Sequence, residues 1–382
     1  MTKILILLKT FDGGTGTFVN DLLKIKESDQ KFHIKIAVLE KPSLKRINNN
    51  KINFFANKNF YPEKYQISLK VLFTLIKEVF WLKKIINELR PDILISIDSH
   101  CLILSQVTKQ LFFRKVKLIA TVHNNIEAVI NHKTPKSLVC LIKILIGDYL
   151  NRADKVICVS KGVSDHLYHY FNLKGNPKVI YYGLNSVYLS NKTQKAKEFN
   201  QLQTKIILVI SRLFPQKDIK TIIKAFELVK NKLPNSKLWI VGDGPLKLKL
   251  KLLFNHLKLK DVKFFGWIDN PIKMMRVSDI FVFSSHWEGF AYTIIEAMSQ
   301  ALPIVATDTP FGPREILDNG KYGVLVPMKD LQAMAKAMYE LLTNEKKYRY
   351  YSQKSLERVK FFSLDKMLKA YKKVILNLIN KQ

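Results

Sequence analysis

Two carboxylates and a glycine turn lie close together between residues 280 and 298 of this sequence. The run Ile280 to Phe283 is short, apolar and β-branched or aromatic, Gly289 interrupts the pattern, and Tyr292 to Met298 has helical periodicity. We therefore predict a buried strand, a turn and a helix. The start of such a helix offers free backbone N–H groups and the positive end of its dipole to a phosphate. The backbone groups concerned belong to Gly289, Phe290, Ala291 and Tyr292.

Glu288 and Glu296 frame this turn, eight residues apart. On one continuous helix they would be separated by about 12 Å along the axis, whereas the carboxylates of a retaining glycosidase lie roughly 5 Å apart. We place Glu288 in the loop and Glu296 on the second turn of the helix, where each can accept hydrogen bonds from different hydroxyls of one long ligand. The alternative is that Glu288 only complements the helix dipole and Glu296 is a solvated helical side chain.

Arg212 and Lys217 follow another predicted strand and lie five residues apart across a turn. Arginine supplies a planar fork of donors and lysine a compact charge, so the two can reach one diphosphate from different sides. The competing interpretation is a pair of solvated loop cations.

Two further features lie in the first half of the chain. Gly14 and Gly16 stand between the first strand and a helix predicted from about Val19, where glycines permit a close backbone approach to an anion. The motif is not a full G-x-G-x-x-G, which argues against a dinucleotide dehydrogenase; a merely tight turn is the alternative. His123 ends a predicted strand, the position at which open α/β sheets bind ligands, although a lone histidine can also be structural.

The whole stretch Phe283 to Met298, with Glu-x7-Glu after Ser-Ser-x-x-Glu-Gly-Phe, resembles the signature of glycosyltransferase family 4. This family comprises retaining, nucleotide-sugar-dependent enzymes of the GT-B fold. The resemblance implies that Arg212 and Lys217 neutralise the leaving diphosphate, that Glu288 holds hydroxyls of the donor sugar and Glu296 the ribose, and that His123 orients the reacting sugar. It also places the glycine-rich turn and two loops near the donor, at Gly14, Gly16, Gly242, Trp267 and Ile268.

The activity implied is transfer of a hexose or N-acetylhexosamine from a nucleotide sugar, UDP-linked in preference to GDP-linked, to an acceptor hydroxyl. In such retaining enzymes the leaving phosphate accepts the acceptor proton, so no protein base is needed. The chain contains no Asp-x-Asp, so we expect no cofactor and no essential metal. Two alternatives stay open: a nucleotide-sugar epimerase of the same fold, and a non-catalytic basic accessory protein that binds lipid or nucleic acid.

Strand candidates alternate with helical patterns along the whole chain, which predicts two doubly wound α/β domains in series. We expect an N-terminal, acceptor-binding Rossmann-like domain at residues 1–185 and a C-terminal, nucleotide-sugar-binding one at 186–363, with the polar linker at 184–205. By resemblance, a helix at 364–382 crosses back to the first domain. The predicted strands are Ile4 to Leu8, Phe32 to Leu39, Ile52 to Phe55, Ile93 to Ile97, Leu118 to Val122, Val156 to Val159, Val179 to Tyr181, Ile206 to Ile210, Leu238 to Val241, Val262 to Phe265, Ile280 to Phe283, Ile304 to Ala306 and Gly323 to Val326.

The composition limits the cellular compartment and the binding partners that we expect for this protein. The apolar N-terminal run is too short for a signal peptide, no run of 18 uncharged apolar residues occurs, and three cysteines without metal or redox spacing suit a reducing compartment. We therefore predict a cytoplasmic protein of bacterial type. The net charge of +32 reflects either a compositional bias or attraction to anionic lipid; no nucleic-acid-binding motif is present.

A membrane surface is the partner that local patterns favour. Residues 66–89 form an amphipathic pattern with an aromatic edge and four lysines, and 111–117 form a weaker candidate. Packing on a core is the alternative for both. The segment Thr307 to Ile316 resembles the corresponding loop of enzymes that extend lipid-linked or lipopolysaccharide glycans. We therefore expect a lipid-linked or lipopolysaccharide glycan acceptor and a peripheral position on the anionic inner membrane face.

Overall fold

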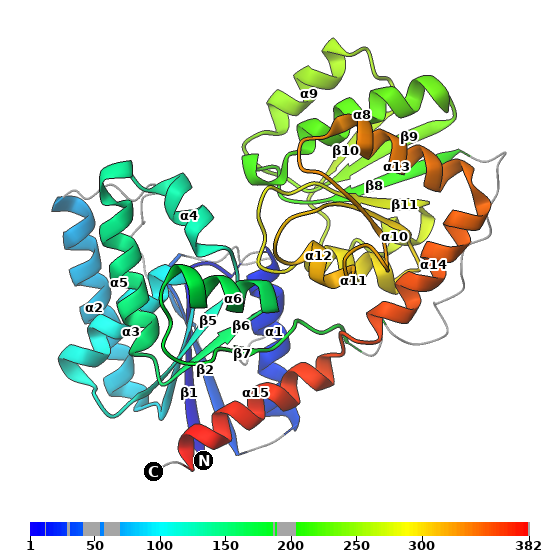
Figure 1. Ribbon diagram of the computed structural model, residues 1–382. Helices are drawn as coiled ribbons and strands as arrows, with labels where there is room; N and C mark the ends of the chain where they lie inside the picture. Colours follow the sequence, from blue (N-terminus) through cyan, green and yellow to red (C-terminus); the bar gives the residue numbers. More distant parts are fainter. Residues whose placement is uncertain are drawn as a thin grey trace. The chain divides into compact units, whose positions relative to one another are not determined.

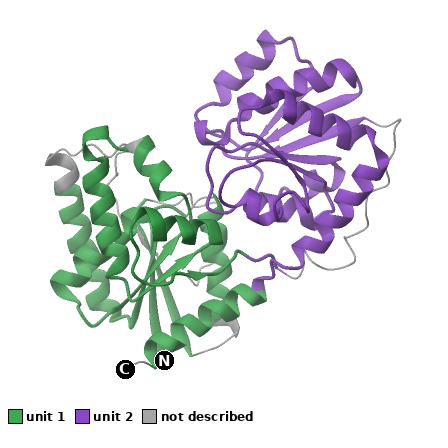
Figure 2. Cartoon of the chain, in the orientation of Figure 1, with its two compact units in different colours: residues 1–182, 365–382 green, residues 183–364 purple. Residues whose placement is uncertain are grey.

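The computed structural model describes residues 1–11, 13–28, 31–40, 54–56, 69–185, 188 and 204–380 (Figure 1). The chain forms two compact units (Figure 2). Unit 1 comprises Met1–Tyr182 and Asp365–Gln382, and unit 2 comprises Gly183–Leu364.

Unit 1 is built on a seven-stranded parallel sheet with the order β3-β2-β1-β4-β5-β6-β7. The order reverses between β1 and β4, and parallel sheets of this kind bind ligands at such a switch point, beyond the carboxyl ends of the strands. Its strands are β1 (Thr2–Leu8), β2 (Phe32–Val38), β3 (Phe54–Ala56), β4 (Ile93–Ile97), β5 (Lys117–Val122), β6 (Lys155–Cys158) and β7 (Lys178–Val179).

The helices of unit 1 cover both faces of this sheet, which explains why its central strands are apolar and buried along nearly their whole length. They are α1 (Gly13–Ser28), α2 (Leu69–Leu89), α3 (Ser99–Phe112), α4 (Ile126–Lys133), α5 (Val139–Asn151), α6 (Lys161–Tyr170) and, from its second residue on, α15 (Leu364–Ile379). Within unit 1, α15 packs against α1, since the rings of Tyr371 and Phe18 lie 5.6 Å apart.

Unit 2 has a six-stranded parallel sheet with the order β10-β9-β8-β11-β12-β13, which reverses between β8 and β11. Its strands are β8 (Lys205–Ile210), β9 (Ser236–Val241), β10 (Val262–Gly266), β11 (Ile280–Phe283), β12 (Ile304–Thr307) and β13 (Val324–Val326). Its helices are α8 (Ile219–Lys232), α9 (Lys247–His256), α10 (Ile272–Val277), α11 (Tyr292–Ser299), α12 (Pro313–Ile316), α13 (Leu331–Thr343) and α14 (Glu345–Val359).

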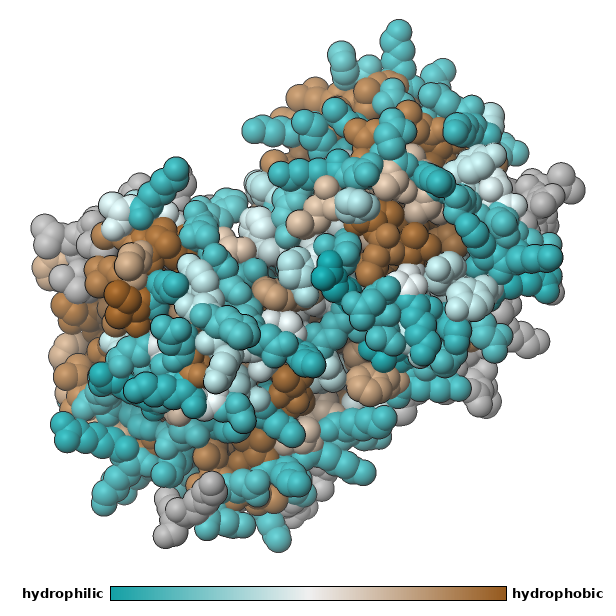
Figure 3. Space-filling view, in the orientation of Figure 1, coloured by the Kyte–Doolittle hydropathy of each residue, from teal (hydrophilic) through white to brown (hydrophobic). Residues whose placement is uncertain are grey.

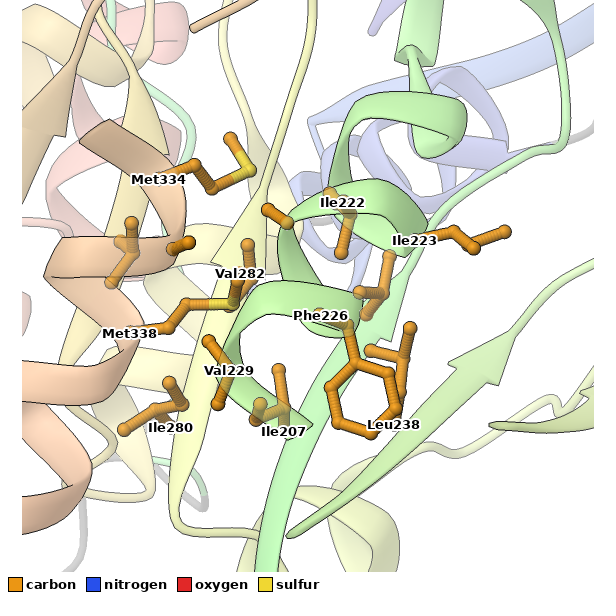
Figure 4. Close-up of a cluster of buried hydrophobic side chains, with 14 of the residues drawn as sticks. Ile207, Ile222, Ile223, Phe226, Val229, Leu238, Ile280, Val282, Met334 and Met338 are labelled. Carbon is orange, nitrogen blue, oxygen red and sulfur yellow. The ribbon is translucent and has the colours of Figure 1, made fainter. Parts of the chain in front are cut away.

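The core of unit 2 fixes the strand ends that carry the candidate site. On α8, Ile222, Phe226 and Val229 follow the 3.6-residue helical period, and each is at most 1 % exposed. They pack over β8 and β11 beside Met334 and Met338 of α13 (Figure 4). Close packing of this kind leaves the sheet little freedom to deform.

The predicted fold class and strand order along the chain are confirmed. Ile93–Ile97 and Ile280–Phe283 match residue for residue, and most other described strands differ by one or two residues at an end. Ile52 and Asn53 lie outside the described residues, as do 186–187 and 189–203 of the predicted linker.

The predicted start of the first helix was wrong. The helix predicted from about Val19 begins at Gly13, because the glycine turn itself forms the first turn of α1. Gly16 makes this tight winding acceptable, since a Cβ there would lie 2.1 Å from the carbonyl oxygen of Phe11. Among the described helices, none is long and apolar enough to cross a membrane.

Candidate active site

The carboxyl edge of the unit 2 sheet brings together loops that are distant in sequence. In a parallel sheet all strands end at the same edge, so the loops after β8, β9, β10, β11 and β12 converge there. These loops carry Arg212, Gly242, Trp267, Glu288 and Asp308. The switch between β8 and β11 places the Arg212 loop beside the Glu288 loop.

Lys217 and Glu288 form a buried ion pair between these two loops. The Lys217 ammonium donates a hydrogen bond to Glu288 Oε1, and the side chains are only 14 % and 9 % exposed. Lys217 stands at the end of the 3₁₀ turn Pro215–Lys217, while Glu288 follows β11. An ammonium group has three donors, so pairing with Glu288 leaves others for an anionic ligand.

Hydrogen bonds around this pair fix both loops. The Gln216 amide donates to the Trp287 carbonyl at 2.6 Å, and the Ser284 hydroxyl donates to the carbonyls of Lys217 at 2.8 Å and Asp218 at 3.0 Å. Thr307, at the end of β12, extends the network by accepting from the Ser285 N–H and donating to the Ser285 carbonyl, both at 2.9 Å. The predicted loop cation and loop carboxylate are therefore held on one rigid support.

Arg212 has a different environment. Its side chain is exposed, and its guanidinium carbon lies 5.3 Å from the centroid of the Phe214 ring. Across the described ranges of the chain, no acidic side chain forms an ion pair with Arg212. The neighbouring Leu213 is fully buried and anchors the loop, so a planar fork of donors stands at the sheet edge on a fixed backbone.

The Arg212 loop packs against two glycines so closely that a residue with a Cβ atom would not fit in their place. At Gly242, which has φ +134°, a Cβ would lie 1.9 Å from the Ser211 carbonyl oxygen; at Gly244 it would lie 2.6 Å from that of Leu213. A backbone hydrogen bond also joins the two loops: the Leu213 N–H donates to the Asp243 carbonyl at 2.9 Å. Lys247 and the Gly244 N–H bind the Asp243 carboxylate and lower its pKa.

The start of α11 lies next to the ion pair. Phe290, Ala291 and Tyr292 are buried, and Ala291 provides no side-chain cap for the helix. The N-terminal N–H groups of a helix have no intrahelical partners and can bind an anion. Glu296 is half-buried on the second turn of α11, the place expected from the sequence.

Gly312 has a supporting role that our sequence reasoning missed. It has φ +73°, and a Cβ there would lie 3.1 Å from Phe290 Cα and 3.3 Å from Glu288 Cβ. Gly312 therefore lets the loop after β12 lie against the turn before α11. The Gly-Pro pair at 312–313 was a signal for such a turn, whereas nothing in the sequence pointed to the bridging bonds of Gln216 and Thr307.

Trp267 and Ile268 follow β10 at the same edge. Trp267 is 42 % exposed, and its indole N–H donates to Asp269 at 2.8 Å. Ile268 is half-buried. The Gly242 N–H donates to the Gly266 carbonyl at 2.7 Å, which places this loop beside the glycine contact.

Unit 1 carries the remaining candidate residues at the carboxyl edge of its own sheet. Gly14 is exposed and Gly16 buried in the first turn of α1, directly after β1. His123 follows β5 and contacts two aromatic rings: it is tilted against Phe18 at a centroid distance of 4.7 Å and stacked on Tyr182 at 5.7 Å.

His123 is held by two hydroxyl groups, and no charged side chain among the described residues pairs with it. Its Nδ1 is hydrogen-bonded to the Tyr182 hydroxyl, and its Nε2 lies 2.8 Å from the Thr121 hydroxyl. Burial lowers its pKa to about 3, because the apolar surroundings disfavour the imidazolium. The side chain is therefore a neutral hydrogen-bonding group at physiological pH. Within the described residues no cluster of three metal-ligating side chains occurs.

Known proteins share both the sequence pattern and the fold. Residues 190–358 match the family "Glycosyl transferases group 1", and residues 35–187 match "Glycosyltransferase Family 4". An uncharacterised glycosyltransferase of Methanocaldococcus jannaschii is 31 % identical over 393 aligned positions, which cover 92 % of this chain and 94 % of that protein. The chain belongs to glycosyltransferase family 4, the retaining glycosyltransferases of the GT-B fold.

More distant relatives agree on the fold. HepE of Anabaena, crystallised with UDP and glucose, superposes with a TM-score of 0.77 at 19 % identity, over 98 % of this chain and 99 % of that one. A sucrose-phosphate synthase of Thermosynechococcus elongatus gives 0.81 at 18 % identity, over the whole of both chains. In sequence, a Campylobacter jejuni N-acetylgalactosaminyltransferase named for a diphospho-undecaprenol-linked acceptor is 32 % identical over 61 % of this chain and 63 % of that protein.

The close contact between Gly242 and Ser211 predicts that a substitution at Gly242 destabilises the fold more than the same substitution at an unconstrained glycine. Gly242→Ala places a Cβ against Ser211 in a backbone conformation that alanine rarely adopts, and we expect it to lower the free energy of unfolding by about 2 kcal/mol or more. Gly175→Ala is the matched control, because a Cβ at Gly175 meets nothing within 4 Å. Urea unfolding measures both; equal stabilities would contradict the role assigned to Gly242.

The lowered pKa of His123 predicts a pH-dependent difference between wild type and His123→Asn. As the pH falls below 6.5, the unfolded chain protonates this histidine, whereas the folded chain does not until about pH 3. The contribution of His123 to folding stability therefore decreases between these values. We expect the stability advantage of wild type over the variant, measured by urea unfolding, to be smaller at pH 4.5 than at pH 7. An advantage that grows on acidification would show a raised pKa instead.

Proposed function

We propose that this glycosyltransferase moves a hexose or N-acetylhexosamine from a UDP-sugar to a hydroxyl of a growing lipid-linked surface glycan at the inner membrane face. The observation that carries the donor half is the Lys217–Glu288 pair beside the exposed Arg212 at one sheet edge. Two relatives support the details: HepE was crystallised with UDP-glucose, and the Campylobacter relative is named for a diphospho-undecaprenol acceptor.

The cations would bind the donor diphosphate. Arg212 offers two parallel donors, Lys217 offers the ammonium donors that Glu288 does not use, and the start of α11 adds backbone N–H groups. Negative charge grows on the departing diphosphate in the transition state, and donors already fixed in place stabilise it without reorganisation. This arrangement provides electrostatic catalysis from side chains and backbone, so we expect turnover in the presence of EDTA.

The carboxylates and the unit 1 residues would orient the sugar and the nucleoside. Glu288 would accept hydrogen bonds from the donor sugar, and Glu296, one to two helical turns further on, would bind the ribose. The loops of Gly242, Trp267 and Ile268 would lie along the base and phosphate. Neutral His123 and the turn at Gly14 and Gly16 would contact the reacting sugar and the donor phosphates.

The chemical step would then need no protein base. The acceptor hydroxyl oxygen forms a bond to the anomeric carbon while the bond from that carbon to the phosphate oxygen breaks. Attack and departure occur on the same face, so the configuration is retained. The released phosphate oxygen takes the proton of the acceptor hydroxyl, which balances the transfer, and a site closed to water would limit hydrolysis of the donor.

Thermal-shift measurements with UDP, GDP, ADP and their sugar conjugates, in EDTA, test the donor site. We expect selective stabilisation by the uridine compounds, because bound ligand stabilises only the folded state. The shift should be lost in Arg212→Ala, since the fork that binds the diphosphate is gone. Arg349→Ala is the control: Arg349 is exposed and pairs with Glu345 on α14. No shift with any nucleotide, or a full shift in Arg212→Ala, would refute the proposal.

Turnover of Glu288→Gln tests the role of the buried carboxylate. The amide keeps the shape but loses the charge that pairs with Lys217, so we expect kcat to fall about 100-fold or more. The control Glu340→Gln changes a partly exposed glutamate that pairs with Lys347 and should keep the wild-type rate. Turnover of Glu288→Gln within a few-fold of wild type would show that this site is assigned wrongly.

A further inference from the structure

Helix α2 is apolar on two opposite sides. Its inner side buries Val79, Leu82, Ile85 and Ile86, each at most 5 % exposed. Its outer side carries three large apolar side chains that are about half exposed to solvent: Phe73 at 62 %, Ile76 at 43 % and Phe80 at 56 %. At 100° per residue these three positions fall within an arc of roughly 60°. Only the inner side is needed for the core of unit 1.

A contact on the buried side of α2 fixes the rotation of this helix about its axis. Glu78, fully buried on its inner side, lies 3.0 Å from Nε2 of His100 on α3, which is also buried. A buried polar pair tolerates little rotation, because turning the helix would leave the carboxylate without its partner. The outer apolar side chains are therefore exposed by the way α2 packs.

The end of α3 extends this apolar surface. Leu111 and Phe112 are 63 % and 37 % exposed, and the Phe112 ring lies 6.2 Å from that of Phe80. Lys83 Nζ stands over both rings, 4.1 Å from the Phe112 centroid and 5.8 Å from that of Phe80. We call Phe73, Ile76, Phe80, Leu111 and Phe112 together the apolar face.

Helix α5, which also packs on α3, adds two more exposed side chains. Leu141 and Ile144 are 57 % and 64 % exposed, and α5 is tied to α3 by a hydrogen bond from the Gln106 amide to the Tyr149 carbonyl at 2.8 Å. An extended hydrophobic area accordingly covers the side of unit 1 that carries these helices (Figure 3). Patches of this kind on a single chain mark interaction surfaces.

The charges around the apolar face are basic. Lys77 and Lys84 are exposed on the same side of α2, and Arg114 and Lys115 are exposed just after α3. Of the two acidic residues in α2, Glu78 is buried and Glu88 lies two turns beyond Phe80. A second copy of this chain, with the same cations and a net charge of +32, would be repelled. An anionic surface is complementary.

We propose that the apolar face docks onto an anionic lipid bilayer. The aromatic and aliphatic side chains enter the headgroup boundary, and Lys77, Lys84, Arg114 and Lys115 bind lipid phosphates, as in helices that lie in a membrane interface. The docking proposal rests on the proposed function in one respect: docking would bring the enzyme to a lipid-linked acceptor. The binding itself can be measured without donor, acceptor or turnover.

Vesicle flotation of the full chain tests the surface, with phosphatidylglycerol-rich and pure phosphatidylcholine vesicles. We expect at least tenfold stronger binding to the anionic vesicles, reduced by salt. Ile76→Glu/Phe80→Glu should lose at least tenfold of that affinity. Lys77→Glu/Lys84→Glu should lose at least as much on anionic vesicles and little on neutral ones, since each basic residue contributes about fivefold. Because all four side chains are solvent-exposed, the variants should keep the wild-type melting temperature.

The matched control is Leu248→Glu/Leu252→Glu on α9 of unit 2. These leucines are 69 % and 60 % exposed among lysines, so α9 is the rival surface, and this variant should bind like wild type. The proposal is overturned if wild type stays unbound, if the α9 variant loses binding while the α2 variants keep it, or if the α2 substitutions abolish a dimer instead. Nucleotide-induced stabilisation that persists in a protein without vesicle binding would reject the docking surface alone.

Discussion

The buried ion pair of Lys217 and Glu288 is the interaction on which the unit 2 site depends. It joins the loops after β8 and β11, the two strands at which the sheet order reverses. Removing charges from water is costly, and the pair is held by hydrogen bonds from Gln216 and Ser284 to the adjacent backbone. Such a pair contributes more to the geometry of the site than to stability, because it fixes a cation and a carboxylate at one edge before any ligand arrives.

The backbone supplies the second half of that support. Gly242, Gly244 and Gly312 permit close contacts between loops: a Cβ would overlap backbone atoms at Gly242 and Gly244 and would be crowded at Gly312. Because the backbone of this loop is fixed by such contacts, its position does not depend on the side-chain contacts of the exposed Arg212. Unit 1 uses the same device at Gly16, beside an aromatic enclosure that keeps His123 neutral.

Sequence periodicity was sufficient for the fold. Buried parallel strands are nearly continuous apolar runs, so Ile93–Ile97 and Ile280–Phe283 could be bounded without error. The start of α1 could not be predicted in this way, because a glycine-rich segment indicates a loop unless its close contact with Phe11 is known. Residue types paired Arg212 with Lys217, and the family resemblance placed Glu288 around the same donor. The direct pairing of Lys217 with Glu288 depends on the switch in strand order, which local patterns do not reveal. The outer side of α2 was visible as an aromatic edge, whereas its exposure required the position of Glu78 against His100.

The main-chain bonds that hold the Arg212 loop also bear on how such an enzyme diversifies. Ser211 and Leu213 are fixed through main-chain bonds to Val241 and Asp243, and these bonds are indifferent to the side chains at those positions. If the proposed function is right, substitutions at solvent-facing neighbours such as Trp267 would alter which nucleotide or sugar is preferred, while Arg212 would stay in place. Selectivity and reactivity would then be separable, and a library directed at the loop after β10 would vary the first while preserving the second.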